Sequence, residues 1–487
     1  MLQTPDSLQI ERPLASPQIE RPLVLERRTI DFIPPEERHG RRSGLFTIWF
    51  AANCQATTAI TGAFAILLGL PMGWAIAALV IGNAVGAIFM AAHSAQGPKL
   101  GIPQMIQSRA QFGFYGAILP LIIVVLMYVG FFASSTVLCG DALTAWTGAP
   151  SWAGILVGAG VSALVTIFGY DLVHRYMRWM SVISGLAFLF LTIRLATTYN
   201  LAAVSHTGTF ALGSFILAMT LAATWQITYA PYVADYSRYL PKETPIPLAF
   251  GLTYAGSFIG STWIMILGCY AVAASKTFVT NPIGFLVHLS PGADWIFYLI
   301  VLGGLIGSNI TNLYGGFMSS TTTFTALMRF RVTRRTRVEY VLVLGIIGSV
   351  LAVVGSTNFF TYFENLIFFL AYFVIPWTAI NLVDFYITRR GKYNIAAIFD
   401  PHGEYGGVSW RAVVSYLVAI GIEIPFVSSS FYVGPMVHLL GGADVSWILG
   451  IAVAGVLYFF LMRQKSASEH GGRSQALAAA AEVARHD

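Results

Sequence analysis

The chain has 487 residues, of which 56% are hydrophobic and only 10% are charged, and its mean hydropathy is +0.69. About a quarter of the residues of a soluble globular protein are charged, so this chain has too little polar surface to face water. Its 47 glycines and 14% aromatic residues favour close-packed membrane helices over an outer-membrane barrel. The net charge of +6 does not predict a nucleic-acid partner, because in a membrane protein the position of charges matters more than their sum. The expected partner is the lipid bilayer.

The N-terminal stretch, residues 1–43, is rich in proline and charge and repeats the hexapeptide QIERPL at 9–14 and 18–23. It lacks the apolar core of a secretory signal peptide. We expect a solvated tail without its own core. The three cysteines, Cys54, Cys139 and Cys269, fall in or beside apolar stretches without CxxC spacing, which predicts neither a disulfide framework nor a metal site.

From residue 44 onward, apolar segments of about 20 residues recur, each long enough to cross a hydrocarbon core of about 30 Å as a helix. We predict twelve, at 44–70, 73–93, 116–139, 152–170, 179–199, 210–238, 247–274, 294–318, 339–356, 359–387, 410–430 and 442–463. With the N-terminus in the cytoplasm, 26 of the 28 Lys and Arg residues fall on the cytoplasmic side, and only Arg194 and Lys276 lie outside. The pattern predicts an inner-membrane protein with both termini cytoplasmic.

Polar residues interrupt two of these segments at mid-depth. The first contains the run FAANCQATT at 50–58, and the sixth contains WQITYAPY at 225–232, with a proline. Unwound backbone is tolerated inside a bilayer only where it lines a cavity, and paired interruptions in two halves point to a transporter's central site. Segments 1 and 6 correspond when ten helices are divided five plus five.

This division predicts the organisation of the chain. We expect a cytoplasmic tail, two inverted repeats of five helices that form the transport core, two further helices and a second tail. Their ranges are 1–43, 44–199, 210–387, 410–463 and 464–487.

Several strings along the chain carry a family resemblance. They are ERRTIDFIPPEER at 26–38, GPKLGIPQ at 97–104 with SR at 108–109, YVGFF at 128–132, ADYSRY at 234–239, NLY at 312–314, and IP at 375–376 followed by DFY at 384–386. Together they resemble the nucleobase:cation symporter family 1, most closely its purine-cytosine permease branch. The resemblance implies an all-α membrane fold of the sodium-symporter type, with broken helices 1 and 6 and two extra C-terminal helices. It also implies import of a nucleobase or related ring with sodium or a proton.

The resemblance places the substrate among the broken helices. Gln55 of helix 1 matches a family amide that would bond the C(=O)–NH edge of a ring, although this side chain could instead bond the unwound backbone. Trp225, Gln226 and Thr228 match the part of helix 6 that supplies an aromatic face and polar contacts. A core or interfacial role for Trp225 stays open.

Helices 3 and 8 supply the remaining substrate candidates. Of Tyr128, Phe131 and Phe132, we expect only one to touch the ring, with Phe131 preferred and Tyr128 next. On helix 8, Asn309 and Asn312 are expected to face the substrate or to bridge helices.

The resemblance also implies a sodium site made of oxygen atoms. The matching residues are Ala51, Cys54 and Gly304 through their carbonyls, with Gly307 and Ser308. Gly307 departs from the family, because sodium-coupled members carry Ser or Thr there. We therefore expect substrate binding to respond only weakly to sodium.

Other ionisable residues in the helices are few. We expect Asp235 and Asp384 to pair with Arg238 and Arg389, whereas Glu423 has no obvious partner near mid-depth.

No Walker sequence, HExxH motif or other catalytic constellation occurs, so neither an enzyme nor an ATP-driven pump is expected. The prediction is a symporter or permease that imports a planar nitrogenous ring such as a purine or cytosine by alternating access, without a cofactor other than a cation. The alternatives are a transporter of hydantoin, allantoin or a vitamin-like pyrimidine, or a non-transporting membrane receptor or channel.

Overall fold

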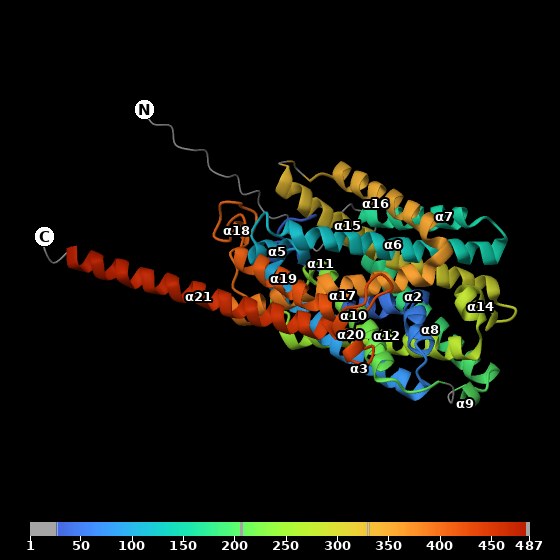
Figure 1. Cartoon of the computed structure of the whole chain (residues 1–487). Helices are drawn as coiled ribbons and strands as arrows, with labels where there is room; N and C mark the ends of the chain where they lie inside the picture. Colours follow the sequence, from blue (N-terminus) through green and yellow to red (C-terminus); the bar gives the residue numbers. More distant parts are fainter. Residues whose placement is uncertain (1–25, 27, 205–207, 329, 331, 484–487) are drawn as a thin grey trace.

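The computed structural model describes residues 26, 28–204, 208–328, 330 and 332–483, and the side chains of these residues up to 464. This part of the chain is helical and contains no β-strand beyond one isolated bridge between Ser428 and Val433 (Figure 1). The long helices run side by side, with short helices at both ends of the bundle.

The helices between residues 44 and 387 follow the predicted order. They are α1 (Gly44–Asn53), α2 (Ala56–Leu67), α3 (Met72–Ala92), α6 (Ile118–Thr147), α7 (Ser151–Phe168), α8 (Tyr170–Thr198), α10 (Leu212–Ile227), α11 (Ala230–Ser237), α12 (Ile246–Ala274), α15 (Asp294–Leu327), α16 (Arg334–Gly355) and α17 (Phe359–Val383). The last two long elements are α19 (Trp410–Glu423) and α21 (Ser446–Val483). Connecting segments include α4 (Gln96–Leu100), α5 (Gln104–Phe112), α9 (Leu201–Val204), α13 (Thr277–Thr280), α14 (Pro282–His288), α18 (Ile395–Ile398) and α20 (Pro435–Leu439).

Each predicted segment contains a helix or a helix pair. Within the described residues, eight helical runs are long and apolar enough to cross a membrane, or nine if the bent pair α1–α2 is one span. One of these runs, Arg334–Thr388, contains both α16 and α17. The chain is therefore a multi-pass membrane protein, whereas the number of crossings and the sides of the termini stay predictions.

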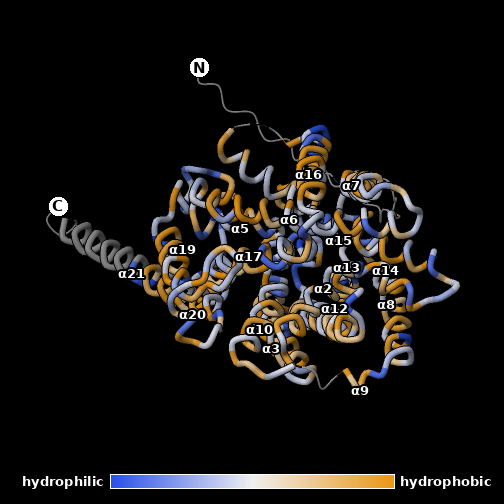
Figure 2. Tube along the Cα trace, turned by 45° about the vertical axis from the view of Figure 1, so that its right-hand side comes forward, coloured by the Kyte–Doolittle hydropathy of each residue, from blue (hydrophilic) through white to orange (hydrophobic). Residues whose placement is uncertain are grey.

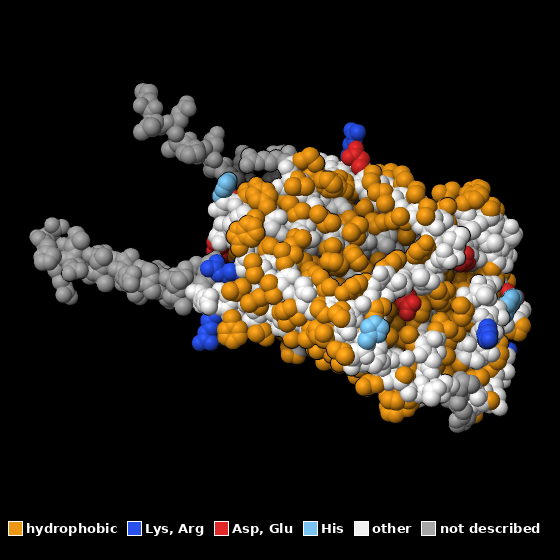
Figure 3. Space-filling view, viewed as in Figure 1, with side chains coloured by type: hydrophobic (Ala, Val, Ile, Leu, Met, Phe, Trp, Pro, Cys, Tyr) orange, Lys and Arg blue, Asp and Glu red, His pale blue; other side chains and the backbone are white. Residues whose placement is uncertain are grey.

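Polarity in this bundle is the reverse of that in a soluble protein. Large apolar side chains point outward, for example Trp179 at 66% and Val354 at 70% exposure, while threonines, asparagines and glutamines lie inside. Paler, more polar stretches run between the orange outer helices in Figure 2, and Figure 3 shows an apolar flank with charges mainly toward its ends. Helices α15 and α6 pack closely at the centre, because Gly315 leaves room for the ring of Tyr128.

The segment that precedes α1 packs onto one end of the bundle. We call Glu26 together with residues 28–42 the strap, and the end that it covers the strap end. Ile33 is fully buried, and its N–H donates to the carbonyl of Gly101 at 2.9 Å. The expectation of a solvated tail is therefore wrong for this part, while the QIERPL repeat lies outside the described residues.

Glu26 joins the strap to several distant helices. One carboxylate oxygen accepts hydrogen bonds from Arg238 at 2.9 Å, Tyr239 at 2.8 Å and Tyr314 at 2.9 Å, and the other lies 3.1 Å from Arg337. These partners come from the end of α11, from α15 and from α16. The strap thus ties together elements that are far apart in sequence.

The expected ion pairs are found in only one of two cases. Arg389 pairs with Asp384 at 3.1 Å as predicted. Arg238 instead pairs with Glu26, and the carboxylate of Asp235 accepts a hydrogen bond from the backbone N–H of Gln104 at 2.8 Å. The difference arises because the strap, which is distant in sequence, takes the arginine that lies one turn from Asp235.

Candidate functional site

The two helix breaks form the centre of the candidate site. Helices α1 and α2 are bent by 56° at a break where Gln55 is fully extended, with φ −152° and ψ 167°. Helices α10 and α11 are separated at Thr228 and Tyr229, just before Pro231. The hydroxyl of Tyr229 donates to the carbonyl of Ala52 at 3.3 Å, so the two breaks lie side by side.

Aromatic side chains gather at this meeting point. Trp225 is 3% exposed, and its ring meets those of Phe131 at 5.9 Å and Tyr229 at 5.9 Å between centroids. Phe363 of α17 approaches the same indole at 6.4 Å. All three contacts are edge-on, so the faces of the rings are not stacked against one another. Such a group can take a planar molecule by stacking.

Two buried amides, one at the first break and one on α15, have unused hydrogen-bonding capacity. The Nε2 group of Gln55 donates to the carbonyl of Ala52 at 3.0 Å, whereas its Oε1 has no partner among the described residues. Asn309 of α15 donates to the hydroxyl of Thr136 at 2.8 Å, and its Oδ1 is also unpartnered. Buried acceptors are normally satisfied, so both oxygens are suited to receive N–H groups of a ligand. Gln55 thus bonds the unwound backbone and keeps a free acceptor.

The other two predicted amides, Gln226 and Asn312, form hydrogen bonds with protein side chains. Gln226 donates to Asn83 at 2.9 Å and to Ser261 at 2.5 Å, and accepts from Ser257 at 2.5 Å. This network lies between α10, α3 and α12 and takes up both ends of the Gln226 amide. It reaches Trp225 only through Asn53, whose Nδ2 donates to Ser257 at 3.2 Å. Asn312 accepts a hydrogen bond from Tyr232 at 2.6 Å and bridges α15 to α11.

The three aromatic residues predicted on helix 3 point in different directions. Only Phe131 faces Trp225. Tyr128 donates to the carbonyl of Pro231 at 3.1 Å and packs against Gly315, while Phe132 packs against Gly348 of α16. Phe131 is therefore the one of the three whose ring contacts Trp225, whereas the Tyr128 hydroxyl bonds the backbone just after the second break.

Thr228 and the indole N–H of Trp225 form hydrogen bonds within the protein. The hydroxyl of Thr228 donates to the carbonyl of Trp225 at 2.8 Å, and the indole N–H of Trp225 donates to Asn53 Oδ1 at 2.8 Å. Sequence reasoning did not single out Asn53. Its place two residues before Gln55, in the same polar run, was the available signal.

The structure brings together only some of the residues that match the sodium site of the family. A Cβ atom at Gly304 would lie 3.6 Å from the carbonyl oxygen of Cys54, so α15 approaches the break of helix 1 there. Gly307 faces the ring of Tyr176 and the sulfur of Met177, and Ser308 accepts a hydrogen bond from Ser135 at 3.4 Å. Ala51 is buried in α1. Of the predicted ligands, the structure thus brings Gly304 of α15 to the Cys54 carbonyl, and residue 307 has no hydroxyl to offer.

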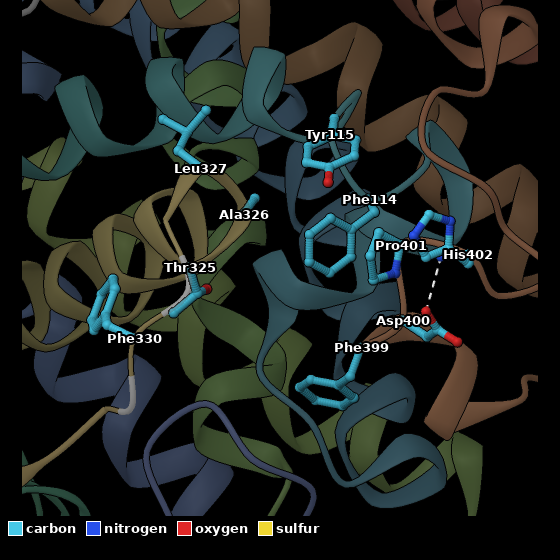
Figure 4. A pocket seen from close by; sticks show the side chains of 10 residues that line it. All are labelled: Phe114, Tyr115, Thr325, Ala326, Leu327, Phe330, Phe399, Asp400, Pro401 and His402. Carbon is cyan, nitrogen blue, oxygen red and sulfur yellow. Dashed lines mark hydrogen bonds between the residues drawn. The ribbon is translucent and has the colours of Figure 1, made fainter.

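Two hollows lie away from this group. The first, about 690 Å³ in volume, is lined by Phe114, Tyr115, the end of α15 and residues 399–402, where Asp400 accepts from the backbone N–H of His402 (Figure 4). The second, about 570 Å³, lies between α17 and α19. Neither includes any of the predicted substrate residues.

Comparisons with known proteins identify the family of the chain. Residues 32–450 match a family described as "Permease for cytosine/purines, uracil, thiamine, allantoin". The chain is 46% identical over 443 residues to YxlA of Bacillus subtilis, which its name assigns provisionally to the purine-cytosine permeases, with 91% of this chain and 97% of that protein covered. It is 26% identical to the purine-cytosine permease fcyB of Emericella nidulans, over 90% of this chain and 88% of the relative.

A solved structure has a similar fold. Mhp1, a nucleobase-cation-symport-1 family transporter in a closed conformation with bromovinylhydantoin bound, superimposes with a TM-score of 0.74 at 18% identity. The match covers 91% of this chain and 96% of that one.

Proposed function

Because the chain belongs to the family of permeases for cytosine/purines, uracil, thiamine and allantoin, we propose that it imports a purine, cytosine or a related planar nitrogenous ring by alternating access. A family of permeases is not one of enzymes. Under this proposal the protein lies in the inner membrane with both termini, and hence the strap end, in the cytoplasm. A cation accompanies the ring.

Two observations carry this proposal: the edge-on contact of Trp225 with Phe131, and the amide oxygens of Gln55 and Asn309, which have no partner among the described residues. A nucleobase combines a flat aromatic face with N–H donors on its edge. The aromatic side chains offer stacking faces, and Gln55 and Asn309 offer acceptors. Edge donors of the ring would satisfy groups that otherwise stay buried without partners.

A thermal-shift screen of the purified protein against purines, pyrimidines, hydantoins and ureides tests the substrate class, because a ligand that binds only the folded state raises Tm. We expect a purine or cytosine to give the largest shift. A larger shift with hydantoin, allantoin or a vitamin-like pyrimidine would favour those alternatives.

Counterflow in proteoliposomes tests the mechanism. A carrier exchanges external labelled ring against an internal unlabelled pool, whereas a channel does not. Binding without counterflow would contradict transport and favour a receptor.

A further inference from the structure

Glu423 is a buried carboxyl group that the substrate site does not use. It is the last residue of α19 and has no exposed surface, and neither of its carboxyl oxygens has a hydrogen-bond partner among the described residues. The helix ends there because Pro425 follows. With 14 residues, α19 is only about 21 Å long, so it ends inside the predicted span of 410–430.

Three helices meet around this carboxyl. A Cβ atom at Gly450 of α21 would overlap Glu423 Oε1, so the carboxyl lies directly against the α21 backbone. The same Cβ position is 3.4 Å from the ring of Pro376 in α17. Pro376 lacks an N–H, which leaves the carbonyl of Tyr372 without its usual helical donor. The carboxyl therefore lies beside a weak point in α17.

The titratable groups near Glu423 are Tyr372 of α17, Tyr416 of α19 and Asp444, which precedes α21, together with Tyr362 and Tyr432, which line the same crevice. Asp444 has its own donors: the Tyr372 hydroxyl at 3.0 Å, the Ser428 N–H at 2.8 Å, and the N–H and hydroxyl of Ser446. Within the described part of the chain, no Lys, Arg or His pairs with either carboxyl. A buried carboxyl without donors or a cation is stable only as the neutral acid, so Glu423 holds a proton in this closed arrangement.

A crevice leads from Glu423 to the surface. It has a volume of about 570 Å³ and is lined by Tyr362, Phe369 and Phe373 of α17, and by Phe431 and Tyr432 of the hairpin after α19. Phe431 is 79% exposed.

Helix α17 connects this carboxyl to the breaks. Its Phe363 contacts Trp225, and further along the same helix Pro376 borders Glu423. A movement of α17 that uncovers the ring site would therefore also change the surroundings of Glu423.

We propose that Glu423 binds the proton that accompanies the ring, an inference that rests on the proposed function. In the closed arrangement the carboxyl is neutral. When α17 moves and water enters the crevice, the O–H bond breaks, the proton passes to a water molecule and the carboxylate remains. Tight ring binding then requires reprotonation.

Ring affinity and counterflow measured from about pH 6 to about pH 8.5 test this proposal. Proton linkage predicts binding roughly tenfold or more weaker at the alkaline end in the wild type. Glu423→Gln mimics the neutral acid, so its affinity should not change with pH, and counterflow should persist while accumulation driven by a pH gradient is lost. Glu339→Gln, an exposed carboxyl on α16 that pairs with Arg335, should behave like the wild type.

Three results would overturn the proposal. The first is ring transport by the wild type that does not depend on pH. The second is a pH dependence of ring affinity that persists in Glu423→Gln. The third is a pH dependence that is lost in Asp235→Asn instead. Infrared difference spectra between the two pH limits give a readout that needs no substrate. The wild-type spectra should show the carbonyl band of a neutral carboxylic acid, and the spectra of Glu423→Gln should lack this band. The same band in both proteins would mean that the proton is bound by another group. Failure of every ring to exchange would instead contradict the proposed function.

Discussion

Trp225 has two kinds of contact, and they respond differently to substitution. Its ring faces the helix breaks, while its indole N–H donates to Asn53 Oδ1 at 2.8 Å. Phenylalanine keeps an aromatic face but leaves the Asn53 oxygen without that donor. Substitutions of Trp225 can therefore distinguish the contribution of its ring to ligand binding from the contribution of its N–H group to stability.

Trp225→Ala should weaken ring binding much more than Trp225→Phe, because stacking needs an aromatic face and not an N–H group. Trp225→Phe should still lower stability by about 1–3 kcal/mol, the cost of a buried acceptor left unpaired. Binding titrations and Tm measurements on both variants separate the effects. Equal losses of binding would indicate a hydrogen-bonding or purely structural tryptophan.

Gln55 and Gln226 should behave differently although both lie at helix breaks. Gln55→Ala removes an unpartnered acceptor and should weaken ring binding about 5- to 150-fold with little change in Tm. Gln226→Ala should mainly lower stability, by about 1–3 kcal/mol, because it removes hydrogen bonds to Asn83, Ser257 and Ser261 from a buried network. A Gln226→Ala variant that has a normal Tm but binds the ring poorly would contradict this prediction and assign Gln226 to the substrate site.

The breaks could be predicted from sequence, but the direction of each side chain could not. Successive residues of a helix point about 100° apart, so Trp225 and Gln226 cannot both face one small site. Which of them does so is decided by packing against Asn83 and Ser257, residues remote in sequence. The same reason separates Phe131 from Phe132. Asn53 was missed because nothing local indicates a partner 172 residues away.

Among the elements, the strap is held by buried charge. Composition predicted a solvated tail because proline and charge rarely form a core. Here the charges are paired with groups such as Arg238 and Arg337, hundreds of residues away, which composition does not reveal. The end of α19 was likewise only partly predictable. Pro425 is visible in the sequence, but the depth at which the helix ends depends on the fold.

Glu26→Ala should destabilise the protein by about 3–5 kcal/mol, because it leaves buried arginines without their carboxylate. Thermal unfolding in detergent provides the measurement. Glu339→Ala is the matched control, since its pair with Arg335 is exposed and i,i+4, and should change Tm very little. Equal effects of the two substitutions would mean that the strap contributes nothing through Glu26.

A second strap contact should depend on pH. His39 Nε2 lies 2.9 Å from Asp171 at the start of α8, and this hydrogen bond raises the pKa of His39 above its usual value, against the opposing effect of burial. A raised folded-state pKa stabilises the protein below the unfolded value of about 6.5, and this stabilisation is lost as pH rises through the folded value. The Tm advantage of wild type over His39→Gln should therefore be present at about pH 5.5 and absent at about pH 9. An advantage that grows with pH would contradict the assignment.

For the whole molecule, the fold and the coupling ion are separate questions. The fold matches a nucleobase-cation transporter closely, yet at 18% identity that likeness extends to the fold alone. Coupling to sodium would depend on a few oxygens at the junction of helix 1 and α15, where the family resemblance implies the site. There Gly304 approaches the Cys54 carbonyl, while Gly307 faces Tyr176 and Met177 and contributes no hydroxyl.

We expect sodium to change ring affinity only weakly. A site with about five oxygens would have about four here, and a hard cation loses affinity with each missing ligand. Ring affinity in choline and in sodium buffer at equal ionic strength is the measurement, because a coupled ion must tighten ring binding as much as the ring tightens ion binding. Gly307→Ser offers a gain-of-function control: a Cβ there would lie 3.2 Å from Tyr176 and 3.3 Å from Met177, so the neighbouring side chains must shift slightly. If only this ligand is missing, the variant should acquire a sodium response. A gain of about tenfold or more in the wild type, abolished by Ser308→Ala, would contradict this prediction and restore sodium as the coupled ion.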